Sequence, residues 1–308
     1  MPRSTRLSPD RPQRIAINGY GRIGRCYLRA LHEAGLSAQF RVVAINEPAD
    51  LASIAYLTRF DSTHGRFPGE VAVADDSLLI DGQAIAISHA TTPEAVPWAS
   101  HDIDLVIECS GQYGSRTELE RFLHAGCQRL LLSQPGNSAE DVDATIVHGI
   151  NDSSLTVDAR LVSNASCTTN AVVPVLALLQ REFGLENVLL TTLHSAMNDQ
   201  PLIDGYHHSD LRRTRSAMQS IIPVSTGLAR GVERLLPVLS GKVQAKAIRV
   251  PTHNVSAIDM VLQLASDADI ERVNALLRSA AERACRGLIA WSDEPHVSID
   301  FNHDPHSA

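Results

Sequence analysis

An octapeptide of small and hydroxyl-bearing residues, Ser-Asn-Ala-Ser-Cys-Thr-Thr-Asn at 163–170, contains the cysteine Cys167. Apolar residues recur at helical spacing after it, as far as Gly184, where a helix would end. Cys167 is therefore expected at a helix N-terminus, where free N–H groups and the helix dipole favour negative charge. Such a cysteine is shifted toward the thiolate, its nucleophilic form. The alternative is a buried structural cysteine, because free cysteines are often buried.

One histidine follows the next predicted strand along the chain. Residues 188–193 (Val-Leu-Leu-Thr-Thr-Leu) are typical of a buried strand, and His194 comes directly after them. A general base must meet its nucleophile in space rather than in sequence, and this strand end could return beside the helix that begins near Cys167. A protonated His194 would lower the pKa of the thiol through its charge. We therefore predict a Cys167–His194 pair.

Arginines are concentrated in the long segment after His194. Three of them stand within residues 212–215, and Arg249 ends a predicted strand over 243–250. Arginine binds phosphate through paired, charge-assisted hydrogen bonds, and Ser-Thr-Gly at 225–227 begins a predicted helix, which also favours anions. These groups predict a phosphate site. The alternative for the arginine run is a solvated basic surface.

A glycine-rich turn near the start of the chain lies between an apolar strand over 14–18 and a helical stretch over 25–34. Gly19, Gly21 and Gly24 form the pattern G-x-G-x-x-G in the strand–turn–helix setting that this motif requires. Glycines permit a tight turn and close approach of the backbone to a pyrophosphate, whose charge the helix N-terminus then favours. The turn predicts a dinucleotide site.

Three further residues end predicted strands that lead to this site. Glu47 follows a strand over 42–45, and an acidic side chain there can bind the adenosine ribose and repel a 2′-phosphate. Ser110 and Ser133 end two later strands, where ligands of such sheets are expected. We therefore predict NAD rather than NADP as the cofactor. The alternative for Glu47 is a solvated loop acid.

The order of predicted elements indicates an α/β protein with two domains. Strands interleaved with helices predict a doubly wound, Rossmann-type parallel sheet over 14–166, with an antiparallel excursion around Asp81-Gly82. Long strands and one amphipathic helix after Cys167 predict an α+β catalytic domain over 167–308 with a mostly antiparallel sheet and a last strand over 297–301. Residues 1–13 carry charge and proline without an apolar core and are expected to form a disordered leader.

The bulk composition excludes several classes of protein. The chain has 308 residues, a net charge of −8 and no run of about 18 apolar residues, which argues against a membrane span and against nucleic acid as the main partner. Its five cysteines lack C-x-x-C spacing, and no secretory signal precedes them. Reduced thiols in the cytoplasm are expected, with no zinc site or other metal site.

The chain resembles the glyceraldehyde-3-phosphate dehydrogenase family over residues 14–308, most specifically at 17–25 (Ile-Asn-Gly-Tyr-Gly-Arg-Ile-Gly-Arg) and at 163–170. The resemblance implies a homotetramer that oxidises a small phosphorylated aldehyde, with Cys167 as nucleophile and His194 as the base that activates it. It implies dinucleotide contacts from Arg22 and Ile23. It also implies that substrate, oxyanion and phosphate are bound by Ser166, Thr168, Arg213, Thr226, Gly227 and Arg249.

Several stretches, including 194–200 (His-Ser-Ala-Met-Asn-Asp-Gln) and 301–307, resemble the members of this family that act on D-erythrose 4-phosphate. They imply 4-phosphoerythronate as product, on the way to pyridoxal 5′-phosphate. Met197 stands where many triose-phosphate enzymes carry threonine, and a thioether cannot hydrogen-bond phosphate as a hydroxyl does. The alternative is a phosphorylating glyceraldehyde-3-phosphate dehydrogenase, which would release its product to phosphate instead of water.

The resemblance also bears on the end of the chain. Relatives continue beyond the position of Ala308 with further strands and a helix, so we expect the C-terminal segment of the family to be absent. An alternative of another class follows from this expectation, namely a catalytically impaired protein that still binds NAD. Against it stand Cys167, His194 and the arginines, none of which is needed to bind a dinucleotide.

Overall fold

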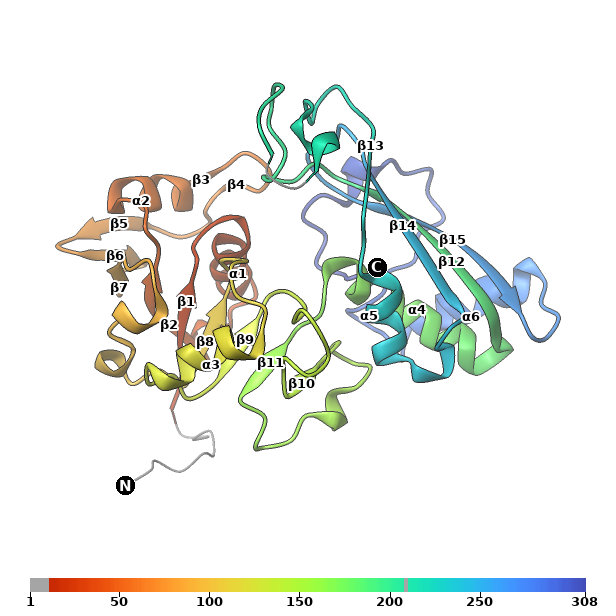
Figure 1. Ribbon diagram of the computed structural model, residues 1–308, viewed down its shortest axis with the longest axis horizontal. Coiled ribbons are helices and arrows are strands. Elements are labelled where there is room, and N and C mark those ends of the chain that lie inside the picture. The colour runs from red at the N-terminus through yellow and green to blue at the C-terminus, as the bar shows by residue number, and fades with distance from the viewer. Residues whose placement is uncertain (1–10, 208–209) are drawn as a thin grey trace. The chain divides into compact units, whose positions relative to one another are not determined.

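The computed structural model describes residues 11–207 and 210–308, and the chain divides into two compact units (Figure 1). The first runs to Ile146 and includes Asn151–Ala165, and the second comprises Val147–Ile150 and Ser166–Ala308. Most of the predicted leader, residues 1–10, lies outside the described residues. Its end is ordered, since Arg11 pairs with Asp104 at 2.6 Å and the first strand already begins at Gln13.

The first unit is built on a nine-stranded sheet in the spatial order β10-β11-β9-β8-β1-β2-β7-β6-β5. Its strands are β1 (Gln13–Asn18), β2 (Phe40–Asn46), β5 (Val71–Ala74), β6 (Ser77–Ile80), β7 (Gln83–Ser88), β8 (Leu105–Glu108), β9 (Leu130–Leu132), β10 (Ala144–Thr145) and β11 (Leu161–Ser163). Its helices are α1 (Arg22–Glu33), α2 (Leu51–Arg59) and α3 (Arg116–His124), and β3 (Phe60–Asp61) pairs with β4 (Gly65–Arg66) in a separate ribbon.

The strand order of this sheet reverses beside β1. The chain passes from β1 to β2 on one side and later returns to β8 on the other, and all pairings from β10 to β7 are parallel. Dinucleotides bind at such a switch point, outside the carboxyl ends of the strands. β6 and β5 continue the sheet as an antiparallel excursion, as predicted, and the left-handed residues Asp81 (φ 48°) and Gly82 (φ 75°) form the turn between β6 and β7.

Both faces of this sheet are buried. Neighbouring residues of β1 belong to different apolar clusters, because successive side chains of a strand point to opposite faces. Ala16 packs in a cluster with Phe122 of α3, whereas Ile17 packs in one with Leu28 of α1 and Ile54 of α2. Helices therefore cover the sheet from both sides, which confirms the predicted doubly wound fold.

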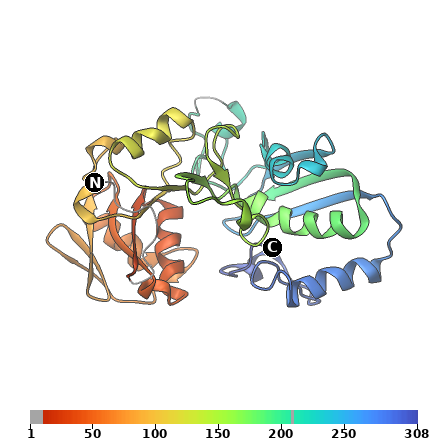
Figure 2. The same ribbon diagram turned by 90° about the horizontal axis from the view of Figure 1, so that it is seen from below.

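The second unit contains a four-stranded sheet in the order β13-β14-β12-β15. Its strands are β12 (Leu185–His194), β13 (Ile222–Val224), β14 (Val243–Arg249) and β15 (Ala257–Leu264), and its helices are α4 (Cys167–Phe183), α5 (Leu228–Leu235) and α6 (Ile270–Glu282). β12 and β14 are parallel, and the two outer pairings are antiparallel. Figure 2 shows the three helices side by side over one face of the sheet.

Two predicted elements differ from the structure. Residues 297–301 were expected to form a strand, but Ser298–Phe301 is a 3₁₀ turn in which the Asp300 carboxylate accepts the Val297 N–H at 2.8 Å. An aspartate that bonds its own backbone in this way competes with strand pairing. Helix α1 begins at Arg22 rather than at residue 25, so the last glycine of the glycine-rich turn lies inside the helix.

Candidate active site and cofactor cavity

Cys167 is the first residue of α4, as the sequence predicts. The residue before it, Ser166, is the N-cap, and its hydroxyl accepts the backbone N–H of Thr169 at 3.1 Å. Ala165, just outside the helix, is held at φ 57°, a left-handed conformation that costs an L-residue about 1–2 kcal/mol. The backbone therefore turns sharply into α4 and leaves Cys167 exposed at the end of the helix where partial positive charge collects.

The predicted thiol–imidazole pair is present in the structure. Cys167 Sγ lies 3.9 Å from His194 Nε2, and His194 Nδ1 lies 2.7 Å from the carbonyl oxygen of Ser195. Because that carbonyl can only accept, Nδ1 carries a proton and Nε2 is the nitrogen that exchanges a proton with sulfur. His194 ends β12, which fixes the direction of its ring.

The two groups shift each other's pKa in opposite directions. The hydrogen bond with His194 is the main cause that lowers the pKa of the Cys167 thiol. Burial opposes this effect, whereas backbone N–H groups at the start of α4 add to it. The contact with Cys167 likewise raises the pKa of His194, against burial and the nearby charge of Arg249. The pair is therefore displaced toward thiolate and imidazolium, as nucleophilic catalysis requires.

Arg249 stands beside the histidine because of strand register. β12 and β14 run parallel with His194 paired to Arg249, so both strands end at the same level. Arg249 is 7% exposed, and its Nη1 contacts Asp199 Oδ1 at 2.5 Å and Gln200 Oε1 at 3.0 Å. A cationic group is thus fixed next to the thiol–imidazole pair, where an anionic substrate could be held.

The three arginines within 212–215 are not simply solvated, because each forms an ion pair. Arg213 Nη1 contacts Asp199 Oδ2 at 3.1 Å, so one carboxylate bridges Arg213 and Arg249. The flanking arginines pair with other acids: Arg212 with Asp210 at 3.1 Å and Arg215 with Asp204 at 2.9 Å. Of the three, only Arg213 is joined through a shared partner to the group beside His194, and an anion would bind there in exchange for Asp199.

Thr226 and Gly227 lie at the start of α5, as predicted, and Gly227 is its N-cap. The Thr226 hydroxyl accepts the Leu228 N–H at 3.2 Å. Helix α5 packs on α4 through a glycine: a Cβ at Gly231 would lie 2.8 Å from Thr169 Oγ1, in the first turn of α4. This close approach keeps the two helix starts together.

Gly231→Ala is expected to lower the free energy of unfolding by about 1–3 kcal/mol, the usual cost of overpacking. Thr169 cannot move aside easily, because it is 2% exposed and its hydroxyl is bonded to Ser166 Oγ at 2.7 Å. Urea unfolding would measure the effect. Gly227→Ala is the matched control, since a Cβ there meets only Arg230 Nη2 at 3.7 Å. Equal stability of the two variants would contradict the packing role of Gly231.

A cavity of about 270 Å³ lies at the carboxyl ends of β1, β2 and β8, in the first unit. This is the switch point of the sheet, and its size is near the lower end of ligand pockets. Its lining comes from the glycine-rich turn, the end of β2 and the segment after β8. The residues are Asn18, Gly19, Gly21, Asn46, Glu47, Pro48, Ala90, Thr91, Cys109, Ser110, Gln112 and Tyr113.

The three motif glycines have different roles in this cavity. Gly19 has φ 84°, and a Cβ there would lie 2.5 Å from the Ser110 backbone. A Cβ at Gly24 would overlap the Gly19 carbonyl oxygen and approach the Ile17 side chain at 3.1 Å, whereas Gly21 has nothing within 4 Å of that position. Gly19 and Gly24 therefore serve the turn and the helix packing, and Gly21 leaves open space for a ligand at the N-terminus of α1. The residues present fit a dinucleotide.

Not all predicted cofactor residues line this cavity. Glu47 and Ser110 do, and Glu47 Oε2 also accepts the Tyr20 backbone N–H of the glycine-rich turn at 2.7 Å. Ser133 does not; its side chain is hydrogen-bonded to the half-buried thiol of Cys109 instead. Arg22 and Ile23, in the first turn of α1, are also not part of the lining, and Ile23 is 51% exposed.

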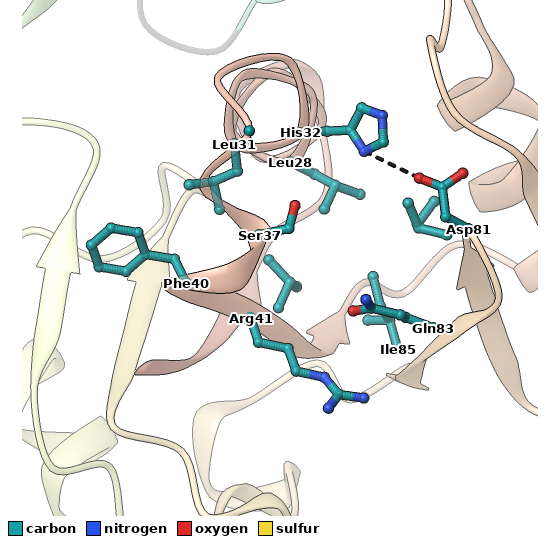
Figure 3. Close-up of a pocket in the computed structure, with 12 residues that line it drawn as sticks. Leu28, Leu31, His32, Ser37, Phe40, Arg41, Asp81, Gln83 and Ile85 are labelled. Atoms are coloured by element: carbon teal, nitrogen blue, oxygen red, sulfur yellow. Dashed lines mark ion pairs between the residues drawn. The ribbon is translucent and has the colours of Figure 1, made fainter. Parts of the chain in front are cut away.

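A second cavity of about 160 Å³ in the same unit is a poorer candidate (Figure 3). It lies at the amino ends of β2 and β7, next to the end of α1, and His32 and Asp81 face each other across its edge at 3.5 Å. Its floor is apolar, with Leu28 and Ile85. Ligands of doubly wound sheets bind at the opposite, carboxyl ends of the strands, which favours the cavity at the glycine-rich turn.

Sequence reasoning missed several groups of both sites. Asn18 and Asn46 end β1 and β2, and the strand-end rule that selected Ser110 could have selected them as well. Asp199 gave no sequence signal of its own, because its role arises from two arginines that lie 14 and 50 residues further along the chain.

Two general properties complete the description of the site. Each of the five cysteines is a free thiol, and Cys167 is the exposed one. In the part of the chain that the structure covers, no helix combines the length and the apolar character needed to cross a membrane.

Comparison with protein families gives two matches. The family model described as glyceraldehyde 3-phosphate dehydrogenase, NAD binding domain, matches residues 13–116, and the one described as glyceraldehyde 3-phosphate dehydrogenase, C-terminal domain, matches residues 166–308. The second match reaches the last residue, Ala308. The prediction that the C-terminal segment of the family is absent is therefore wrong, and the impaired NAD-binding protein that depended on it loses its basis.

The two matches together span more than half of the chain and agree with its two units. The first assigns NAD as the cofactor of the glycine-rich domain. The second covers Cys167, His194 and Arg249. The chain belongs to the glyceraldehyde-3-phosphate dehydrogenase family, as an NAD-dependent oxidoreductase that acts on a phosphorylated aldehyde.

Proposed function

We propose that this enzyme oxidises D-erythrose 4-phosphate to 4-phosphoerythronate, an early step toward pyridoxal 5′-phosphate. The observation that carries the chemistry is the Cys167–His194 contact at the start of α4, beside Arg249. The preference for the four-carbon substrate rests on the sequence, above all on Met197 in place of a hydroxyl residue. Met197 is 43% exposed at the start of the loop after β12, where it cannot contribute a hydroxyl to a phosphate subsite.

The chemistry begins at sulfur. The Cys167 thiolate adds to the aldehyde carbon and forms a thiohemiacetal, whose oxygen is stabilised by His194 and by the Cys167 backbone N–H. His194 starts as the imidazolium and gives its Nε2 proton to that oxygen. NAD, when bound, supplies the acceptor for the hydride of that carbon, while the now neutral His194 Nε2 takes the hydroxyl proton back and then releases it to solvent. The resulting thioester on Cys167 is hydrolysed when a water that His194 deprotonates adds to its carbonyl. The C–S bond then breaks and regenerates the thiolate.

We assign the substrate phosphate and oxygens to the predicted set of Ser166, Thr168, Arg213, Thr226, Gly227 and Arg249. Two buried donors that make no hydrogen bond support an anion site among these groups. Arg213 Nε lies 3.8 Å from Asp210 Oδ2, too far for a hydrogen bond, and Gln200 Nε2 has no hydrogen-bond partner in the described residues, although Gln200 Oε1 contacts Arg249. A phosphate oxygen would satisfy such donors, whereas their burial without a partner costs about 1–3 kcal/mol each.

The second candidate is a phosphorylating glyceraldehyde-3-phosphate dehydrogenase, because both reactions share the first half. The two candidates are separated by measuring rates of NADH formation. Each of the two aldehydes, D-erythrose 4-phosphate and glyceraldehyde 3-phosphate, is tested with and without inorganic phosphate. We expect the higher kcat/KM with D-erythrose 4-phosphate and no requirement for phosphate. A higher value with the three-carbon aldehyde, together with a strict need for phosphate, would reverse the assignment.

Glu47→Ala is expected to narrow the preference for NAD over NADP by about 10-fold, as loss of one hydrogen bond to a charged group implies. The carboxylate lines the cavity and can accept a ribose hydroxyl, and its charge repels a 2′-phosphate. Dissociation constants for both dinucleotides measure the ratio. Glu70→Ala, an exposed acid of the same unit, is the control. Equal affinity of the unmutated enzyme for both cofactors would remove Glu47 from this role.

We further propose a cytoplasmic homotetramer whose partners are small molecules, as the resemblance implies. The face of the second sheet that α4, α5 and α6 leave uncovered carries apolar side chains. Leu189 and Val261 are paired across β12 and β15 and are 44% and 58% exposed. Exposed apolar groups on one sheet face favour contact with another subunit. Sedimentation equilibrium measures the assembly, and a monomer at micromolar concentration would contradict it.

A further inference from the structure

A buried carboxylate stands at the end of the central strand β8, beside the cofactor cavity, and the reaction does not use it. Glu108 is 0% exposed. Its Oε2 accepts from Asn18 Nδ2 at 2.5 Å, and its Oε1 accepts both the backbone N–H of Ser110, at 2.7 Å, and the Ser110 hydroxyl. Asn18 and Ser110 line the cavity. Glu108 therefore holds two residues of the cavity lining in place through hydrogen bonds, without lining the cavity itself.

The direction of these hydrogen bonds is fixed by the backbone. Asn46 Oδ1 accepts the Ala90 N–H at 3.0 Å, and Asn46 Nδ2 donates to the Ala90 carbonyl at 3.0 Å. The amide of Asn46 cannot be turned over without losing both bonds. Its Nδ2 also donates to Asn18 Oδ1 at 2.9 Å, which leaves Asn18 Nδ2 pointing at Glu108.

Both carboxylate oxygens of Glu108 must therefore act as hydrogen-bond acceptors. One faces the NH₂ group of Asn18 and the other faces the N–H of Ser110, and neither donor can be reversed. A glutamine at this position would place its own NH₂ group against one of these donors. A protonated carboxyl group would also have one oxygen that donates, and that proton could go only to the Ser110 hydroxyl. The network thus fits the carboxylate form.

The same network holds the glycine-rich turn. The N–H of Gly19 donates to the Asn46 carbonyl at 2.9 Å, and the N–H of Cys109 donates to the Asn18 carbonyl at 2.7 Å. The backbone of Gly19 packs directly on that of Ser110. A shift of the segment after β8 would therefore move the turn against which a dinucleotide binds.

The hydrogen-bond donors to Glu108 are neutral groups: the Asn18 amide, the hydroxyl and N–H of Ser110, and the N–H of Gly111. The charge of Glu108 also contributes to the raised pKa values of the Cys109 thiol and the Tyr113 phenol. Burial raises the pKa of Glu108, although the bonds from Ser110 and Asn18 oppose this shift. Its protonation is therefore displaced from the usual range of a glutamate toward neutral pH.

We propose that Glu108 is a positioning residue for NAD, which as a carboxylate fixes Ser110 and the glycine-rich turn, and that its protonation weakens cofactor binding as the pH falls. Protonation reverses the bond to the Ser110 hydroxyl, which then directs its own hydrogen elsewhere. It also weakens the acceptor for the Ser110 N–H. Ser110 and the glycine-rich turn are then no longer held in one position, although every side chain that lines the cavity is still present.

Calorimetric titration of the enzyme with NAD tests the proposal without any assay of activity. We expect the dissociation constant of the unmutated enzyme to rise as the pH falls from 8 to about 5. Glu108→Gln should raise it by about 10-fold or more at pH 8 and abolish the pH dependence. Glu120→Gln, on α3 in the same unit, replaces a half-buried acid paired with Arg116 and should leave the NAD titration unchanged.

A double variant distinguishes an effect of hydrogen-bond direction in this network from a general loss of folded structure. In Asn18→Asp combined with Glu108→Gln, the new aspartate accepts from Asn46 and from the new glutamine, whose oxygen accepts the Ser110 N–H. Every donor then has an acceptor again, and NAD affinity should recover at least partly. Failure of recovery in a folded double variant would overturn the proposal. If Glu108→Gln does not fold, the unmutated enzyme still provides a test. An NAD affinity that does not change with pH would then overturn the proposal.

Discussion

Cys167→Ser is expected to lower the rate of NAD-dependent aldehyde oxidation at least about 100-fold while NAD affinity stays within about twofold. A serine hydroxyl at the start of α4 remains protonated at neutral pH, so the attacking anion is lost. The cofactor cavity lies in the other unit and is lined by none of the residues around Cys167. Steady-state rates and calorimetric NAD titration of the same preparation separate the two effects.

The remaining cysteines provide matched controls for this variant. Burial raises the pKa of the thiols of Cys109 and Cys127 to about 12, so neither supplies a thiolate near neutral pH. Cys127→Ala and Cys285→Ala should keep most of the turnover, although each removes a buried side chain and lowers stability. More than about a hundredth of normal turnover in Cys167→Ser would exclude covalent catalysis through this residue.

His194→Asn is expected to lower kcat by about 10²–10⁴, the usual contribution of a general acid–base group. It should also move the alkylation of Cys167 to higher pH. In the unmutated enzyme the pKa of this thiol is lowered chiefly by His194, so alkylation by iodoacetamide should reach half its maximal rate below the pH at which an ordinary thiol does. Without the imidazole only the start of α4 favours the thiolate.

The pH profile of alkylation measures this shift directly. His207→Asn, a half-buried histidine of the loop after β12, is the control and should reproduce the unmutated profile. An unchanged profile in His194→Asn would assign the thiol activation wholly to the helix. A lower rate of aldehyde oxidation together with an unchanged profile would restrict His194 to the later proton transfers.

Local patterns in the sequence predicted the positions that depend on one element. Cys167 at a helix start and Gly19 before α1 follow from helix and turn chemistry over a few residues. The pairing of Cys167 with His194 needed only the expectation that a strand returns beside that helix. These features are local, so a short window contains the information that determines them.

Features that depend on distant partners could not be predicted in this way. The arginine run gave no sign that Asp199 bridges Arg213 and Arg249, because three separate elements must assemble first. Ser133 ends β9 as predicted, yet its hydroxyl is used by the Cys109 thiol, a neighbour that only the strand order brings close. The strand expected at 297–301 failed because the Asp300 side chain bonds the backbone locally.

The parallel register of β12 and β14 has a consequence for how this enzyme can diversify. His194 and Arg249 meet because both strands run without a bulge from the pair Val188–Val243 to their last residues. One residue inserted into β14 would turn Arg249 to the other face of the sheet, since side chains alternate with a period of two. The loop between β12 and β13 has no strand register to keep, so apart from Asp199, Gln200 and Arg213, which are tied to Arg249, it tolerates changes in length. Insertions and deletions are therefore expected to accumulate in the rest of that loop and to alter substrate choice. The distance between His194 and Arg249 should stay the same.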